Sequence, residues 1–146
     1  MIAIASFVNV SVGDAARSDA RRAPQRVGAV LSGLAVLFLL LDAVVKLLAL
    51  PVVLQTSAEL GLPATPAFAQ GLGVLLLACT LLYVWPRTAV VGAVLLTGYL
   101  GGAIATHVRA NNPLLTHVLF GLYVALFVWG GLYLRDPRVR ALVGRR

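Results

Sequence analysis

An acidic and a basic residue interrupt a long apolar run in the first third of the chain. Asp42 and Lys46 stand four residues apart within Gly28–Leu50. This spacing places both side chains on one face of a helix, in the acid-to-base order that favours an ion pair. Charged groups are costly in an apolar environment and usually mark a cavity, a pairing or a pathway. The pair therefore predicts a polar site inside an otherwise apolar helix.

Four more polar residues share that depth in three other apolar runs. Two stand at the end of the third run that would lie beside Asp42 and Lys46 in an antiparallel bundle. One more stands about a turn inside the corresponding end of the second run, and another inside that of the fourth. Counted at about 1.5 Å per residue, antiparallel packing brings all four to the level of the ion pair. Such groups could move protons or donate hydrogen bonds to a carbonyl oxygen. They are Gln70, His107, Arg109 and His117.

The aromatic residues fall into two groups. One group stands near the ends of the second and fourth runs, where an aromatic belt at a membrane–water interface is expected. Its members are Tyr83, Trp85, Trp129 and Tyr133. Tyr99 and Tyr123 lie near the middle of their apolar runs. A hydroxyl there needs either a hydrogen-bond partner within the packed helices or a cavity to point into. The candidate catalytic residues are thus Asp42, Lys46, His107 and His117, and the candidate substrate-binding residues are Arg109, Gln70, Tyr99 and Tyr123.

Simpler structural roles also account for these residues. Lys46 can extend toward the membrane surface with Asp42 as its neutralising partner, and the histidines can belong to ordinary loop ends. A metal site built from Asp42, His107 and His117 is not favoured, because both histidines lie at span ends and no third nitrogen ligand is present. We therefore expect no metal.

Four apolar runs must position these groups. Each has about 19 to 23 residues, enough for a helix to cross a hydrocarbon layer of about 30 Å. Ten of the twelve Lys and Arg residues flank one side of the runs, so the positive-inside rule places both termini in the cytoplasm. The sequence predicts an all-α integral membrane four-helix bundle of up-down-up-down topology. Its parts are a basic tail (1–27), the bundle 28–134 (Gly28–Leu50, Ala67–Trp85, Thr88–Val108 and Leu114–Leu134) and a second basic tail (135–146).

Composition excludes several protein classes. A hydrophobic content of 60% with only 12% charged residues is not that of a soluble domain. The net charge of +7 comes from residues that flank spans, so we expect contact with the lipid bilayer and no nucleic-acid binding. Cys79 is the only cysteine, which excludes an internal disulfide and a dithiol pair. The sequence shows no haem, flavin or iron–sulfur signature, so no resident cofactor is expected, although a quinone could be a ligand.

The third run carries small residues at helical spacing. Small residues four apart let helix backbones approach closely, so this run is predicted to be the central helix of the bundle. The longest connection, Pro51–Pro66, could fold over the outer mouth. The small residues form two stripes, Ala93, Thr97, Gly101 and Ala105 in one, and Gly98 with Gly102 in the other.

Several segments together carry a family resemblance. They include Gly98-Tyr99-Leu100-Gly101-Gly102-Ala103, Thr106-His107 and Asp42-Ala43-Val44-Val45-Lys46-Leu47. Through these segments, the stretch Leu39–Leu142 resembles the DoxX-like family of small bacterial four-span membrane proteins. The resemblance implies the bacterial cytoplasmic membrane and, through the family's name, an association with thiosulfate:quinone oxidoreduction. Most members have no established reaction, so no catalytic residue is transferred.

Two functional hypotheses remain open. In the first, an outward-facing polar chamber binds a small lipophilic, quinone-like molecule, either in an oxidoreductase-associated subunit or in a cofactor-free acid/base isomerase or cyclase. In the second, the chain is a non-catalytic accessory or assembly subunit that docks onto a membrane-protein partner or another copy of itself. A transporter is less favoured, because no inverted repeat or broken helix is evident.

Overall fold

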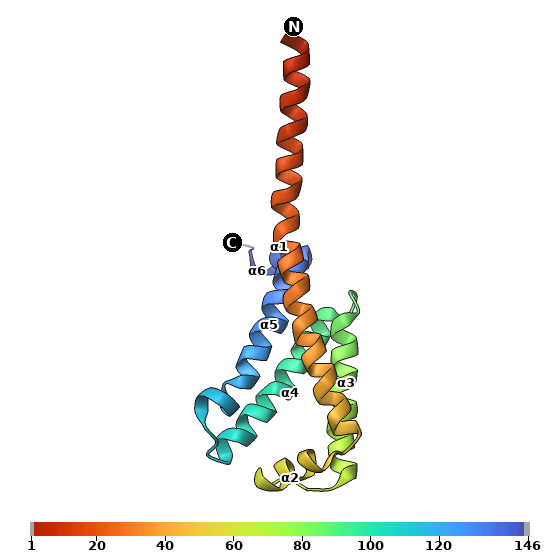
Figure 1. Cartoon of the computed structure of the whole chain (residues 1–146), viewed down its shortest axis with the longest axis vertical. Coiled ribbons are helices and arrows are strands. Elements are labelled where there is room, and N and C mark those ends of the chain that lie inside the picture. Colours follow the sequence, from red (N-terminus) through yellow and green to blue (C-terminus); the bar gives the residue numbers. More distant parts are fainter. Residues whose placement is uncertain (1, 145–146) are drawn as a thin grey trace.

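The computed structural model describes residues 2–144, and side chains within residues 23–142. This part of the chain contains helices and no strand (Figure 1). The elements are α1 (Ile2–Leu47), α2 (Pro51–Glu59), α3 (Pro66–Val84), α4 (Ala89–Arg109), the π-helix η1 (Leu114–Val118), α5 (Phe120–Arg135) and α6 (Pro137–Val143).

Within residues 2–144, four helical segments are long and apolar enough to cross a membrane. They are Ala23–Leu47, Pro66–Val84, Ala89–Arg109 and Leu114–Arg135. The prediction of four helices able to span a membrane is confirmed, and the first of them begins and ends earlier than the predicted Gly28–Leu50. Many large apolar side chains point outward, Leu37 and Leu41 among them, as expected for contact with lipid. The side of the membrane on which the termini lie stays a prediction.

The segments outside the predicted spans contain more helix than the sequence suggests. The backbone of α1 is helical from Ile2, so the residues predicted as an N-terminal tail continue the first span beyond the bundle (Figure 1). The long connection after α1 contains α2, which begins at Pro51. Proline suits the first helical position, where its missing N–H is not needed. The fourth span begins as the π-helix η1 before it continues as α5.

The four spans form a ring of neighbours. α1 packs against α3 and α5, and α4 packs against the same two helices from the other side. α4 therefore lies diagonally across from α1. The prediction that it is the central helix is wrong, because helices α3 and α5 separate it from α1.

Glycines do make the close helix contacts, but mostly not those predicted. A Cβ added at Gly131 of α5 would overlap Ser32 Oγ of α1, and one at Gly92 of α4 would overlap the backbone of Tyr83 in α3. Among the described parts of the chain, Gly98 and Gly101 instead have no heavy atom within 4 Å of an added Cβ. Their predicted packing role is not met within this chain. The glycines at helix interfaces are Gly28, Gly73, Gly92, Gly121 and Gly131.

The other predicted packing residues divide similarly. Ala93 is fully buried in the core, and Thr97 Oγ1 accepts a hydrogen bond from Trp129 Nε1 of α5 at 2.8 Å. Ala105 is exposed, and Gly102 borders a cavity. The stripe that begins at Ala93 therefore reaches the core only at that residue, because α4 and α5 diverge from α1 and α3 beyond it.

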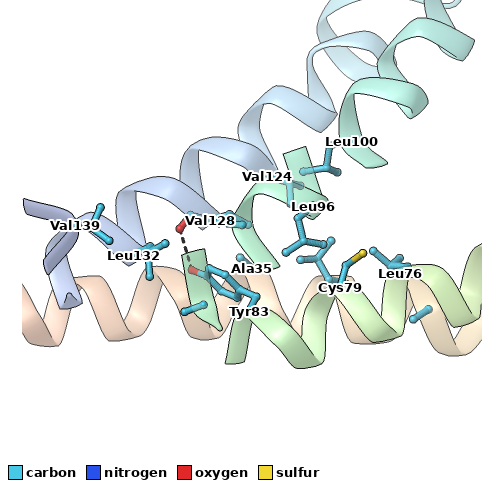
Figure 2. Close-up of a cluster of buried hydrophobic side chains, with 14 residues drawn as sticks. Ala35, Leu76, Cys79, Tyr83, Leu96, Leu100, Val124, Val128, Leu132 and Val139 are labelled. Atoms are coloured by element: carbon cyan, nitrogen blue, oxygen red, sulfur yellow. Dashed lines mark hydrogen bonds between the residues drawn. The ribbon is translucent and has the colours of Figure 1, made fainter. Parts of the chain in front are cut away.

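A hydrogen-bonded tyrosine lies in the apolar core at the end of the bundle nearer the termini (Figure 2). Tyr83 is fully buried, and its hydroxyl donates to the carbonyl oxygen of Val128 at 2.8 Å. The same hydroxyl lies 2.8 Å from Ser32 Oγ, which therefore donates to it. This network joins α1, α3 and α5. Tyr83 is thus not a member of the lipid-facing aromatic belt, whereas Trp85 is well exposed.

Candidate functional site

A cavity of about 690 Å³ occupies the end of the bundle that carries α2. Its volume lies in the range of small-molecule sites. All four spans contribute to its wall, and α2 borders it. In Figure 1 α4 and α5 diverge from α1 and α3 toward this end, whereas the buried core fills the other end. The lining is mostly apolar, with Phe38 of α1 and Phe120 of α5 in edge-to-face contact at 5.0 Å between ring centroids.

The predicted ion pair forms and lines this cavity. Lys46 Nζ donates to Asp42 Oδ1 at 2.5 Å. The Lys46 side chain is 19% exposed and that of Asp42 32%, so each charge lies partly within the protein beside its counter-charge. An ammonium group has three N–H donors, and a carboxylate accepts several hydrogen bonds. The pair therefore retains capacity to hydrogen-bond a ligand.

Two histidines face each other across the helix connection at the same cavity. His107 lies in the last turn of α4, His117 lies in η1, and their ring centroids are 5.8 Å apart. Asn112 Nδ2 lies 2.8 Å from His107 Nδ1, and Thr116 Oγ1 lies 2.8 Å from His117 Nδ1. Because an amide NH₂ only donates, neutral His107 carries its proton on Nε2 in this arrangement. Both histidines line the cavity, and so does the ion pair. Four of the residues that were predicted to share one level therefore border the same cavity.

The π-helix explains how His117 is presented. Single turns of π-helix are wider than α-helical turns and occur frequently at functional sites. η1 follows a tight turn in which Asn111 adopts a left-handed conformation with φ of 54°. Asparagine tolerates this conformation better than most residues. The turn and η1 together bring His117 back toward the end of α4.

One of the two mid-span tyrosines reaches the site. Tyr99 of α4 is half-buried and lines the cavity. Tyr123 of α5 is 43% exposed and does not line it. The buried face of α5 passes through Gly121, Val124 and Val128, and Tyr123 lies off that face.

Two other candidates, Gln70 and Arg109, lie outside the cavity. Gln70 is exposed, because α3 turns Ala69 and Gly73 inward and Phe68 and Leu72 toward the cavity. Arg109 Nη2 donates to the carbonyl oxygen of Leu60 at 2.6 Å. Arg109 therefore joins the end of α4 to the segment after α2. Neither position supports a direct ligand contact.

The sequence suggests that the connection Pro51–Pro66 could fold over the outer mouth, but it does not indicate which residues of α2 line the cavity. Val53, Thr56 and Ser57 of α2 line the cavity, and Thr106 does so from α4. Ser57 is buried, and its hydroxyl donates to the Val53 carbonyl oxygen at 2.8 Å. The helix-starting Pro51 after the ion pair was the available signal for a helix at this place. Within the described side chains, no three His, Cys, Asp or Glu residues gather as a metal site would require.

The chain matches a known protein family over most of its length. A profile of the DoxX-like family matches residues 30–131. This chain belongs to the DoxX-like family. The matched region of this DoxX-like protein contains the ion pair, Tyr99 and both histidines. Comparison with curated proteins and with solved structures gave no significant match.

Proposed function

We propose that this DoxX-like membrane protein binds a small lipophilic molecule with a polar head, such as a quinone, in the cavity at the α2 end. The observation that supports this proposal is the meeting of Asp42, Lys46, His107, His117 and Tyr99 at one mostly apolar cavity. Such a site suits an amphipathic ligand, because apolar walls favour a ring or tail and a few polar groups orient the head.

The polar groups divide naturally between donors and acceptors. Lys46 Nζ and the imidazole N–H groups are donors for a ligand carbonyl oxygen, and the Tyr99 hydroxyl can donate or accept. Asp42 offsets the charge of Lys46, so a neutral ligand enters without leaving an unpaired charge in the cavity. This distribution favours a neutral carbonyl compound over an anion.

Two chemistries are compatible with this binding mode. In an acid/base isomerisation or cyclisation, Asp42 or a histidine takes a proton from the ligand and a neighbouring imidazole returns one. In an oxidoreductase-associated role, a partner subunit supplies electrons to the bound quinone. The acid/base route needs only groups at the cavity. The cavity would open to the outer face of a bacterial cytoplasmic membrane, following the positive-inside rule.

A single binding experiment tests the proposal. The purified protein in lipid nanodiscs is mixed with ubiquinone-2, and the bound fraction is read by native mass spectrometry. We expect one quinone per chain, with affinity lowered about tenfold or more in Asp42→Asn and in His107→Ala. Gln70→Ala and Tyr123→Phe are matched controls, because both residues lie outside the cavity. No stoichiometric binding, or equal binding by all variants, contradicts the proposal.

An accessory role remains a second candidate because of one observation. Gly98 and Gly101 of α4 are exposed and have open space around them. Exposed glycines on a membrane helix allow close approach of another helix. Copurification of a stoichiometric membrane protein that Gly98→Leu releases would support this role.

A further inference from the structure

The helix α2 covers the cavity while being held by few contacts. It packs mainly against α3, and the packing of the four spans does not include it. Ser57 on its inner side is only 7% exposed and lines the cavity. Gln55, two residues earlier, is exposed. α2 thus borders the cavity through Ser57 on one side and faces outward through Gln55 on the other.

Left-handed turns lie on both sides of α2. Ala49 has a φ of 47° in the turn from α1, and Gly61 has a φ of 66° after the helix. A left-handed alanine is strained relative to glycine, so the Ala49 turn stores free energy that an altered turn would release. We call the segment Pro51–Leu60 between these turns the α2 cap.

The side chain of Arg109 holds the C-terminal end of the α2 cap. Arg109 Nη2 donates to the Leu60 carbonyl oxygen at 2.6 Å. A Cβ added to Gly61 would lie 3.5 Å from the same Nη2 atom. The guanidinium therefore rests against the turn after α2. A planar guanidinium with several donors is well suited to holding a carbonyl in a fixed direction.

We propose that the α2 cap is a lid over the cavity and that Arg109 is its latch. When the bond from Arg109 to Leu60 breaks, the cap turns about Ala49 and Gly61 and opens the cavity to the membrane surface. This assigns Arg109 a role in access to the site instead of in ligand contact. That the lid controls ligand exchange rests on the proposed function, whereas the lid itself can be tested without a ligand.

The test uses cysteine accessibility in the full chain in nanodiscs. Cys79 is buried and is the only cysteine, so Cys79→Ala gives a cysteine-free background. Ser57→Cys reports on the inner side of the cap and Gln55→Cys on its outer side. Each is labelled with a membrane-impermeant methanethiosulfonate, with and without Arg109→Gln. Arg87→Gln, which removes an exposed charge from the Trp85–Thr88 turn, is the matched control.

We expect Ser57→Cys to react slowly and to become about tenfold faster in Arg109→Gln, with no change in Arg87→Gln. Gln55→Cys should react rapidly in all backgrounds. The lid is overturned if Ser57→Cys reacts as fast as Gln55→Cys while Arg109 is present, or if Arg109→Gln leaves its rate unchanged.

Two further variants separate a loosened latch from a damaged fold. Arg109→Lys keeps the charge but loses the planar fork, and should label at an intermediate rate. Gly61→Ala strains the left-handed turn without altering Arg109, and should also accelerate labelling of Ser57→Cys. Faster labelling without ubiquinone-2 binding would support the lid and contradict the proposed function. Quinone binding with unchanged labelling would support the proposed function and contradict the lid.

Discussion

Lys46 and Asp42 form their ion pair within a single helical turn of α1, at the wall of the cavity. Because the pair is local, the folding of α1 alone brings the two charges together. The opposing histidines, by contrast, come from α4 and η1 and need the turn through Asn111 and Asn112 to meet. The site therefore combines one locally determined pair with a second pair that depends on the bundle.

Neutralising one member of the ion pair should destabilise the protein more than neutralising both. Asp42→Asn or Lys46→Met leaves a partly buried charge without its partner, and we expect each to lower the free energy of unfolding by about 1–2 kcal/mol. The double variant removes both charges and should lose less stability than either single variant. Unfolding in mixed detergent micelles measures all four proteins. Simple additivity would show that the two charges are stabilised independently.

Asn112 should matter for ligand binding more than for stability. It orients the His107 ring through the contact between its amide and Nδ1. Asn112→Ala removes the group that fixes the orientation and the tautomer of the His107 ring. We therefore expect the affinity for ubiquinone-2 to fall by about threefold to tenfold, while the midpoint of thermal unfolding changes little. Asn111→Gly is a neighbouring control that keeps the left-handed turn. Equal loss in both variants would contradict this role of Asn112, because Asn111→Gly keeps both the turn and the contact between Asn112 and His107.

The depth of the polar residues could be predicted from the sequence, but their direction could not. A count along four antiparallel helices brings Asp42, His107 and His117 to one level, and the structure places all three at one cavity. Gln70 satisfies the same count but faces outward, because its direction depends on how α3 is rotated against α1. Rotation follows from the detailed packing of glycines and large side chains, which a single sequence does not show.

The predicted helix-packing stripe illustrates the same limit. Gly98 and Gly101 have the spacing typical of close helix contacts, yet the contacts form at Gly92 and Gly131. Spacing alone cannot distinguish these positions, because all four glycines lie within predominantly apolar helices. The fold class needed only the length and apolar character of the four runs.

The tyrosine in the core should contribute measurably to stability. Tyr83→Phe removes the hydroxyl that bonds the Val128 carbonyl and accepts from Ser32. We expect a loss of about 1 kcal/mol in the free energy of unfolding, the usual value for a hydrogen bond between membrane helices. Tyr133→Phe, at an exposed tyrosine on α5, should change stability little. A comparable loss in both would argue against the buried network, and quinone affinity should be unaffected in either.

Two adjacent glycines on α5 should respond in opposite ways to alanine. At Gly131 an added Cβ would overlap Ser32 Oγ and would lie 2.7 Å from the Ser32 backbone nitrogen. The hydroxyl can rotate away but the backbone cannot, so α1 and α5 must separate, and we expect a loss of about 2 kcal/mol. At Gly130 an added Cβ meets nothing within 4 Å. Gly130→Ala should therefore leave stability unchanged or raise it by up to about 1 kcal/mol, because alanine is the better helix former.

Detergent unfolding of the two alanine variants distinguishes these effects with a single methyl group moved by one residue. If Gly131→Ala is tolerated as well as Gly130→Ala, the close contact between α1 and α5 at Ser32 is not present in the membrane. If Gly130→Ala is instead the damaging change, a neighbouring helix from another chain must occupy the open space beside α5. The second outcome would favour an accessory subunit that docks through its glycines, because only an added partner supplies atoms for the methyl group to meet.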